Sequence, residues 1–165
     1  MLRLARNYYK DLNNYLCEMS EVNIKNKKAF FEFHILSKYN AGIALLGTEI
    51  KSIRNNNANL IDAFCTFNNS ELYIKNLHIG ELKNAGLNNH IPKRDRKLLL
   101  NRLELNKIKS KVKEKGITII PLRLFINKNG KAKIEIALSK GKKLFDKRES
   151  LKEKDIKRDI NRSLK

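Results

Sequence analysis

Apolar and polar residues alternate along much of the middle of the chain, a pattern typical of half-buried β-strands. Phe31, Phe33 and Ile35 alternate with polar neighbours and predict the first strand. Asn68-Asn69-Ser70 and Asn127-Lys128-Asn129-Gly130 each separate two such runs, so we expect a hairpin at both places. Further strands are expected at 42–46, 60–67, 72–79, 117–126 and 132–138. Pro121 interrupts one of them and predicts an edge or a bulge there.

A spacing of three to four residues predicts two helices. The first covers 47–54, with Thr48 as its N-cap and Ile50 and Ile53 on one face. The second runs from about residue 95 to 115 and ends at Gly116. Its expected apolar face consists of Leu99, Leu103, Ile108 and Val112. The intervening stretch 80–92 has no period and is expected to be a loop.

The two ends of the chain differ from its middle. Residues 1–20 place apolar side chains at helical spacing, namely Leu4, Tyr8, Leu12, Tyr15, Leu16 and Met19. We therefore divide the chain into an N-terminal extension (1–25), a folded domain (26–139) and a basic tail (140–165). Ser150 and Glu153 are spaced as a capping box, but the apolar stripe behind them is thin. The tail is expected to be disordered when free and helical on a partner. Whether Met1 or Met19 starts the protein stays open.

About six strands with few helices predict a mainly β fold. A sheet of this size leaves exposed edges unless it closes, so a small β-barrel with added helices is the expected architecture.

The charge of the chain points to a polyanionic partner. Thirty-six Lys and Arg against 17 Asp and Glu give a net charge of +19. Cationic side chains release counterions from phosphates, which drives binding to nucleic acids. Cys17, Cys65 and three scattered histidines form no zinc motif, no cofactor motif is present, and Cys65 is expected in the core. No apolar run approaches the ~20 residues of a membrane span. A reducing, cytoplasmic setting is expected.

Three motifs in order resemble those of the SsrA (tmRNA)-binding protein family, SmpB. They are Ala41-Gly42-Ile43 through Gly47–Arg54, then Arg96–Arg102, then Lys140–Glu149. The resemblance runs from about residue 26 to the C-terminus, and the first twenty residues have no counterpart. It departs at Phe31 and Phe33, where relatives usually carry His and Tyr.

The resemblance implies a fold and a task. The fold is a small barrel like that of oligonucleotide-binding proteins, with flanking helices and a basic C-terminal tail. The task is binding of the tRNA-like part of tmRNA and, with elongation factor Tu, delivery to stalled ribosomes. The tail would then occupy the empty mRNA channel near the decoding centre of the small subunit. A monomer is expected.

The resemblance also implies which residues contact tmRNA. Glu49 matches a glutamate on the barrel surface, where it would accept hydrogen bonds from RNA and orient nearby cations. Candidate RNA contacts are Lys27, Lys28, Glu49, Lys51, Arg54, Arg94, Arg96, Lys97 and Asn101.

In the tail, Gly141 would let the chain bend away from the barrel. Phe145 would stack on a base, and Asp146 would orient a cation. The expected ribosome contacts are Gly141, Lys142, Lys143, Phe145, Asp146, Lys147 and Arg148.

Two other functions compete with this one. A basic ribosomal or ribosome-assembly protein without tmRNA specificity fits the charge and size equally well. A metal-dependent nuclease would use the Glu-x-Lys spacing of Glu49 and Lys51, but it needs a further carboxylate at the metal, and Asp11 is the only Asp upstream. We therefore expect a protein that is not an enzyme.

Overall fold

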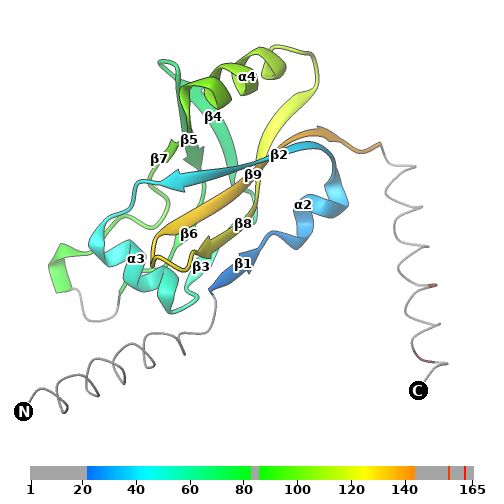
Figure 1. Ribbon diagram of the computed structural model, residues 1–165. Helices are drawn as coiled ribbons and strands as arrows, with labels where there is room; N and C mark the ends of the chain where they lie inside the picture. Colours follow the sequence, from blue (N-terminus) through cyan, green and yellow to red (C-terminus); the bar gives the residue numbers. More distant parts are fainter. Residues whose placement is uncertain (1–21, 83–85, 144–155, 157–161, 163–165) are drawn as a thin grey trace, which may run out of the picture.

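The computed structural model describes residues 22–82, 86–143, 156 and 162, and its centre is a closed antiparallel β-barrel (Figure 1). The strands follow one another around the sheet in the order β1-β8-β4-β5-β7-β2-β9, and β9 pairs again with β8 to close the ring. The strands are β1 (Asn23–Lys25), β2 (Phe33–Ile43), β4 (Phe64–Asn68), β5 (Glu71–Lys75), β7 (Arg96–Leu99), β8 (Ile117–Ile126) and β9 (Ala132–Gly141). The expected mainly β barrel with flanking helices is confirmed.

Short elements surround this ring. The helices are α2 (Lys27–Glu32), α3 (Gly47–Arg54), α4 (Arg102–Val112) and the 3-10 turn η1 (Gly86–Asn88). Two-residue strands β3 (Ala58–Asn59) and β6 (His78–Ile79) form a separate small sheet. The core is aliphatic and includes Cys65, as expected.

The first predicted strand is partly a helix. Phe31 lies in α2, and the extended chain begins at Phe33 and continues unbroken to Ile43. The helix forms because Asn26 caps it: the Asn26 side chain accepts a hydrogen bond from the Ala29 N–H at 3.1 Å. The alternation of aromatic and polar residues around Phe31 suggested a strand, although these residues form the short capped helix α2.

The long helix predicted from residue 95 is also two elements. Arg96 and Leu98 are buried while Leu99 is exposed, a period of two that belongs to strand β7. α4 begins only at Arg102, after Asn101 and Glu104 form a capping box. Of the predicted apolar face, only Ile108 is fully buried, whereas Leu99 and Leu103 are exposed.

Tight turns divide two other predicted strands. Asp62 and Asn76 adopt positive φ, so that β4 begins at Phe64 and β5 ends at Lys75. The predicted hairpins are confirmed, since β4 pairs with β5 and β8 with β9. The register of β8 and β9 shifts between Pro121 and Arg123, which confirms the predicted bulge.

The sheet extends past both predicted ends of the folded domain. β1 pairs with β8 beside β4, although its residues lie before residue 26. At the other end, β9 continues to Gly141, which lies opposite Phe33 of β2. Gly141 thus ends a paired strand within the barrel wall.

Candidate nucleic-acid interface

A buried carboxylate holds two arginines at the junction of α3 and β7. Glu49 Oε1 accepts hydrogen bonds from Arg94 Nε at 2.7 Å and from Arg96 Nε at 2.8 Å. Glu49 Oε2 accepts from Arg94 Nη2 at 2.5 Å and from the Leu46 N–H at 2.7 Å. We call Glu49, Arg94 and Arg96 the α3 cluster. With two cations and one anion, it retains one net positive charge.

The two arginines of the α3 cluster differ in what they present to solvent. The Arg96 side chain is fully buried, and its Nη1 and Nη2 donate to the carbonyl oxygens of Leu77 at 2.6 Å and Pro92 at 3.0 Å. The Arg94 side chain keeps 29% of its surface exposed. Arg96 therefore ties the loop before β7 to the barrel, while Arg94 brings the charge of the cluster to the surface.

The electrostatics of the α3 cluster keep Glu49 ionised. Burial alone would raise the pKa of this carboxyl group, but hydrogen bonds from Arg94 and the Leu46 N–H, with the charge of Arg96, bring it below its ordinary value. A buried carboxylate paired in this way anchors the start of α3 and fixes the guanidinium groups in position.

This arrangement corrects the expected position of Glu49. Its side chain has no exposed surface, so it does not lie on the barrel surface as expected. Arg96 is likewise interior and presents no charge to a ligand. The surface cations of this region are Lys51 and Arg54, which are exposed on α3. Both oxygens of Glu49 are already bonded to cations or a backbone amide, which leaves it unsuited to hold the metal of a nuclease.

A buried histidine near α3 was missed by the sequence interpretation. His90 Nε2 lies 3.1 Å from the carbonyl oxygen of Ile79, and Nδ1 lies 2.9 Å from Thr48 Oγ1. Because a carbonyl oxygen only accepts, Nε2 is the donor in the contact with Ile79. His90 therefore links Thr48 of α3 to Ile79 of β6. The N-cap position of α3, which was predicted to be Thr48, is occupied by Leu46.

Lys97 and Asn101 lie along the same strand–helix connection as Arg96. Lys97 Nζ is paired with Glu71 on the neighbouring strand β5, and the hydrogen bond to that carboxylate raises the pKa of Lys97. Asn101 is exposed and caps α4. Lys97 therefore reaches the surface as part of an ion pair, and Asn101 has a structural task of its own.

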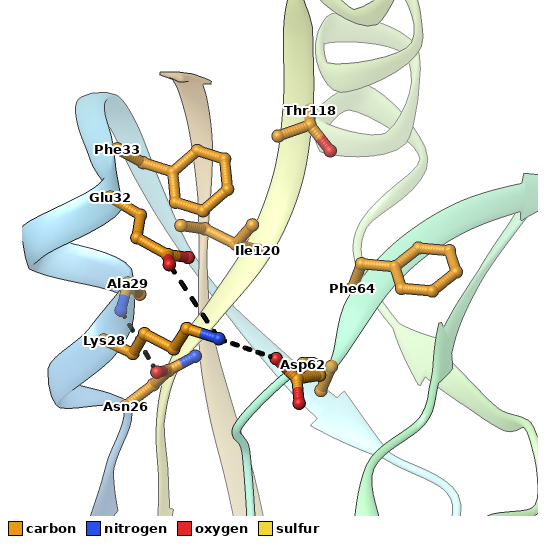
Figure 2. A pocket seen from close by; sticks show the side chains of 10 residues that line it. Asn26, Lys28, Ala29, Glu32, Phe33, Asp62, Phe64, Thr118 and Ile120 are labelled. Carbon is orange, nitrogen blue, oxygen red and sulfur yellow. Dashed lines mark hydrogen bonds and ion pairs between the residues drawn. The ribbon is translucent and has the colours of Figure 1, made fainter. Parts of the chain in front are cut away.

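The predicted contacts Lys27 and Lys28 lie on α2, apart from α3 in Figure 1. Figure 2 shows Lys28 extended across a pocket toward Asp62 and Glu32, with Nζ distances of 3.0 and 3.8 Å. The hydrogen bond to Asp62 raises the pKa of Lys28. Lys27 is exposed on the same helix. The nine predicted contacts thus lie in three places: on α2, in and around the α3 cluster, and along the β7–α4 connection that carries Lys97 and Asn101.

The root of the tail lies against α2. The backbone N–H of Lys142 donates to the carbonyl oxygen of Glu32 at 2.8 Å, and its Nζ lies 3.4 Å from that of Phe30. Gly141 and Lys143 are exposed on either side of it. Gly141 therefore does not turn the chain away, and the chain stays attached to the barrel through Lys142. Phe145, Asp146, Lys147 and Arg148 lie outside the described residues.

The described residues hold neither a metal-binding cluster nor a membrane-spanning helix. No three His, Cys, Asp or Glu side chains within 22–82 and 86–143 gather closely enough to bind a metal ion. None of the helices in that part of the chain is long and apolar enough to cross a membrane.

The chain is similar in sequence to SsrA-binding proteins of several bacteria. The chain is 56% identical to the SsrA-binding protein of Bacteroides thetaiotaomicron over 144 residues. The aligned residues make up 87% of this chain and 96% of that protein. The chain is 49% identical over 140 residues to the SsrA-binding protein of Thermosipho africanus, with 85% and 94% covered.

A solved structure and a family model extend the comparison. The structure described as "tmRNA-SmpB: a journey to the center of the bacterial ribosome" contains a chain with 40% identity and a TM-score of 0.64, matching 74% of this chain and 86% of that one. The family model described as "SmpB protein" matches residues 23–165, which include the barrel, the α3 cluster and the basic tail. The chain therefore belongs to the SmpB family.

Proposed function

We propose that this chain binds the tRNA-like part of tmRNA and delivers it to stalled ribosomes for trans-translation. The observation that carries the proposal is the extent of its similarity to SsrA-binding proteins, about half of all positions over almost their whole length. That similarity spans both the cationic barrel and the tail. The chain would act in the cytoplasm as a monomer, and elongation factor Tu would join through the tmRNA complex.

The cations around α3 support tmRNA binding by the barrel. Lys51 and Arg54 are exposed on α3, and Arg94 keeps part of its side chain exposed in the α3 cluster. Cations that are exposed on and near α3 would attract a phosphate backbone. Glu49 and Arg96 act as positioning residues, since their bonds hold Arg94 and the first turn of α3 in place.

The tail would supply the ribosome contacts. Lys142, Lys143, Lys147 and Arg148 are cations for ribosomal RNA phosphates, and Phe145 is an aromatic ring for stacking on a base. Asp146 would orient one of these cations. In this proposal the tail lies in the mRNA channel left empty on a stalled ribosome, next to the decoding centre.

A competition binding experiment tests the proposal against generic adhesion to polyanions. The purified chain is bound to a labelled tRNA-like fragment of tmRNA at moderate salt and challenged with that fragment or with a scrambled RNA of equal length. We expect the tmRNA fragment to compete at least about ten-fold better, because contacts beyond counterion release respond to RNA shape. Equal competition would reject tmRNA recognition and favour a basic ribosomal or assembly protein.

A further inference from the structure

A groove at one end of the barrel is apolar and open. It lies where β2 leads into α3, beside the β8–β9 hairpin (Figure 1), and has a volume of about 500 Å³. Leu46 and Leu99 on its walls are 50% and 54% exposed. The groove is lined by Gly42, Ile43, Leu45, Leu46, Gly47, Ile50, Leu99 and residues 130–133. Half-exposed leucines around a concave surface are a site where another apolar segment would be stabilised.

The chain enters the barrel close to this groove. The Val22 carbonyl oxygen accepts a hydrogen bond from the Ile126 N–H at 3.3 Å, and Ile126 lies opposite Ala132, which lines the groove. Val22 and Ala132 are therefore two strand spacings apart, or about 10 Å. Residues 1–21 are joined to the barrel at Val22. As a helix, this segment would have a length of roughly 30 Å, which is enough to cross the groove.

The sequence of these 21 residues matches the groove in polarity. Leu12, Tyr15, Leu16 and Met19 recur at a spacing that gives one apolar stripe on a helix. Glu18 and Glu21 are the charges nearest to Val22, whereas Lys131 and Lys133 line the groove. Apolar side chains would thus meet the leucines, and carboxylates would meet the lysines.

We propose that residues 1–21 dock in this groove through the stripe of Leu12, Tyr15, Leu16 and Met19. Because the segment is covalently attached about 10 Å from the groove, its effective concentration there is high, and a weak contact is sufficient for docking. The family match begins at residue 23, so the docking segment is an addition to the family's barrel. The proposal does not depend on tmRNA binding.

Methyl NMR of the full chain tests the docking, after intact mass has verified a start at Met1. Three proteins are compared: the unchanged chain, Leu12→Asp with Leu16→Asp, and the charge-matched control Asn13→Asp with Asn14→Asp. A helix would turn both asparagines away from the stripe. A soluble paramagnetic agent reports the solvent exposure of the Leu46 and Leu99 methyl groups.

We expect the leucine double variant to raise the relaxation of these methyl groups roughly two-fold or more, since undocking exposes half of each side chain again. The asparagine control should leave it unchanged. Methyl groups of Ile120, in the pocket beside α2, should not respond in any variant. Equal relaxation in all three proteins would overturn the proposal, as would groove signals that change only with protein concentration or with added RNA.

Discussion

At the scale of single residues, the most consequential group is the buried carboxylate of Glu49. It pairs with two arginines, and its removal would leave the buried Arg96 with an uncompensated charge in the interior and Arg94 without its partner. Breaking a buried ion pair on one side costs about 3–5 kcal/mol. We therefore expect Glu49→Gln to lower the free energy of unfolding by about 3 kcal/mol in urea denaturation. Lys51→Gln, on the exposed face of the same helix, is the control and should change it by less than about 0.5 kcal/mol.

The stabilising effect of Glu49 should depend on pH. Its pKa in the folded chain lies below the ordinary value of 4.5, so the unfolded chain takes up the proton first as the pH falls. The stabilisation is complete above about pH 4.5 and is lost as the pH falls through the lower pKa of the folded state. The stability difference between the unchanged chain and Glu49→Gln should hence be constant from pH 7 to about 5 and shrink toward pH 3. A difference that grows on acidification would contradict this ionisation state.

The exposed cations of α3 lead to a prediction about salt. Each cation that neutralises an RNA phosphate steepens the fall of log affinity with log salt by about 0.7–0.9. Lys51→Gln with Arg54→Gln should therefore reduce that slope by about 1.5 for the tRNA-like fragment. The matched control is Lys107→Gln with Lys111→Gln, two exposed cations on α4. If both double variants change the slope equally, the cations of α3 contact RNA no more than those of α4, and the proposed role of α3 is wrong.

At the scale of elements, Asn101 shows how a sequence motif can serve the fold. Its capping box with Glu104 starts α4 directly after β7. Asn101→Ala should cost about 1 kcal/mol of stability, whereas Asn101→Ser keeps a capping oxygen and should cost little. Thermal unfolding measures the stability of both variants. Binding of the tRNA-like fragment is measured for the same two variants. If Asn101→Ser weakens RNA binding while stability is kept, the amide itself contacts RNA.

Elements with local signals were predictable from the sequence, and those set by tertiary contacts were not. The Asn-Gly hairpin, the bulge at Pro121 and helix 47–54 follow from turn chemistry, proline and helical spacing. Strand β7 was hidden because Arg96, a charged residue, is buried at a position that a strand pattern reserves for an apolar one. Its burial depends on Glu49, 47 residues away in the sequence, and no local pattern reports such a partner.

The candidate site was predictable in the same uneven way. Family resemblance selected Glu49, Arg94 and Arg96 without indicating that they touch one another. The surface position expected for Glu49 was wrong because a first-turn glutamate normally faces solvent, whereas here two arginines compensate its burial.

At the scale of the whole molecule, two basic regions lie on different sides of the barrel (Figure 1). One consists of the cations of α3, and the other of α2 with the root of the tail. This separation predicts that binding and ribosome function can be divided by truncation. A cut after Ser139 would remove Lys140 and Gly141, which pair with β2, and the hydrogen bond from Lys142 to Glu32. A truncation after Lys143 keeps these contacts, and it therefore tests the role of the tail without damaging the barrel.

A chain ending at Lys143 should keep the thermal stability of the barrel and bind the tRNA-like fragment within about three-fold of the full chain, because the α3 face and β9 are intact. Tagging on stalled ribosomes should fall to background, since the cations and the aromatic ring proposed for the mRNA channel are gone. The control is a full-length chain with Lys152→Gln and Lys154→Gln, which keeps residues 144–148 while lowering the tail charge. If the truncated chain loses tmRNA binding instead, the tail belongs to the RNA-binding surface and the proposed division is wrong.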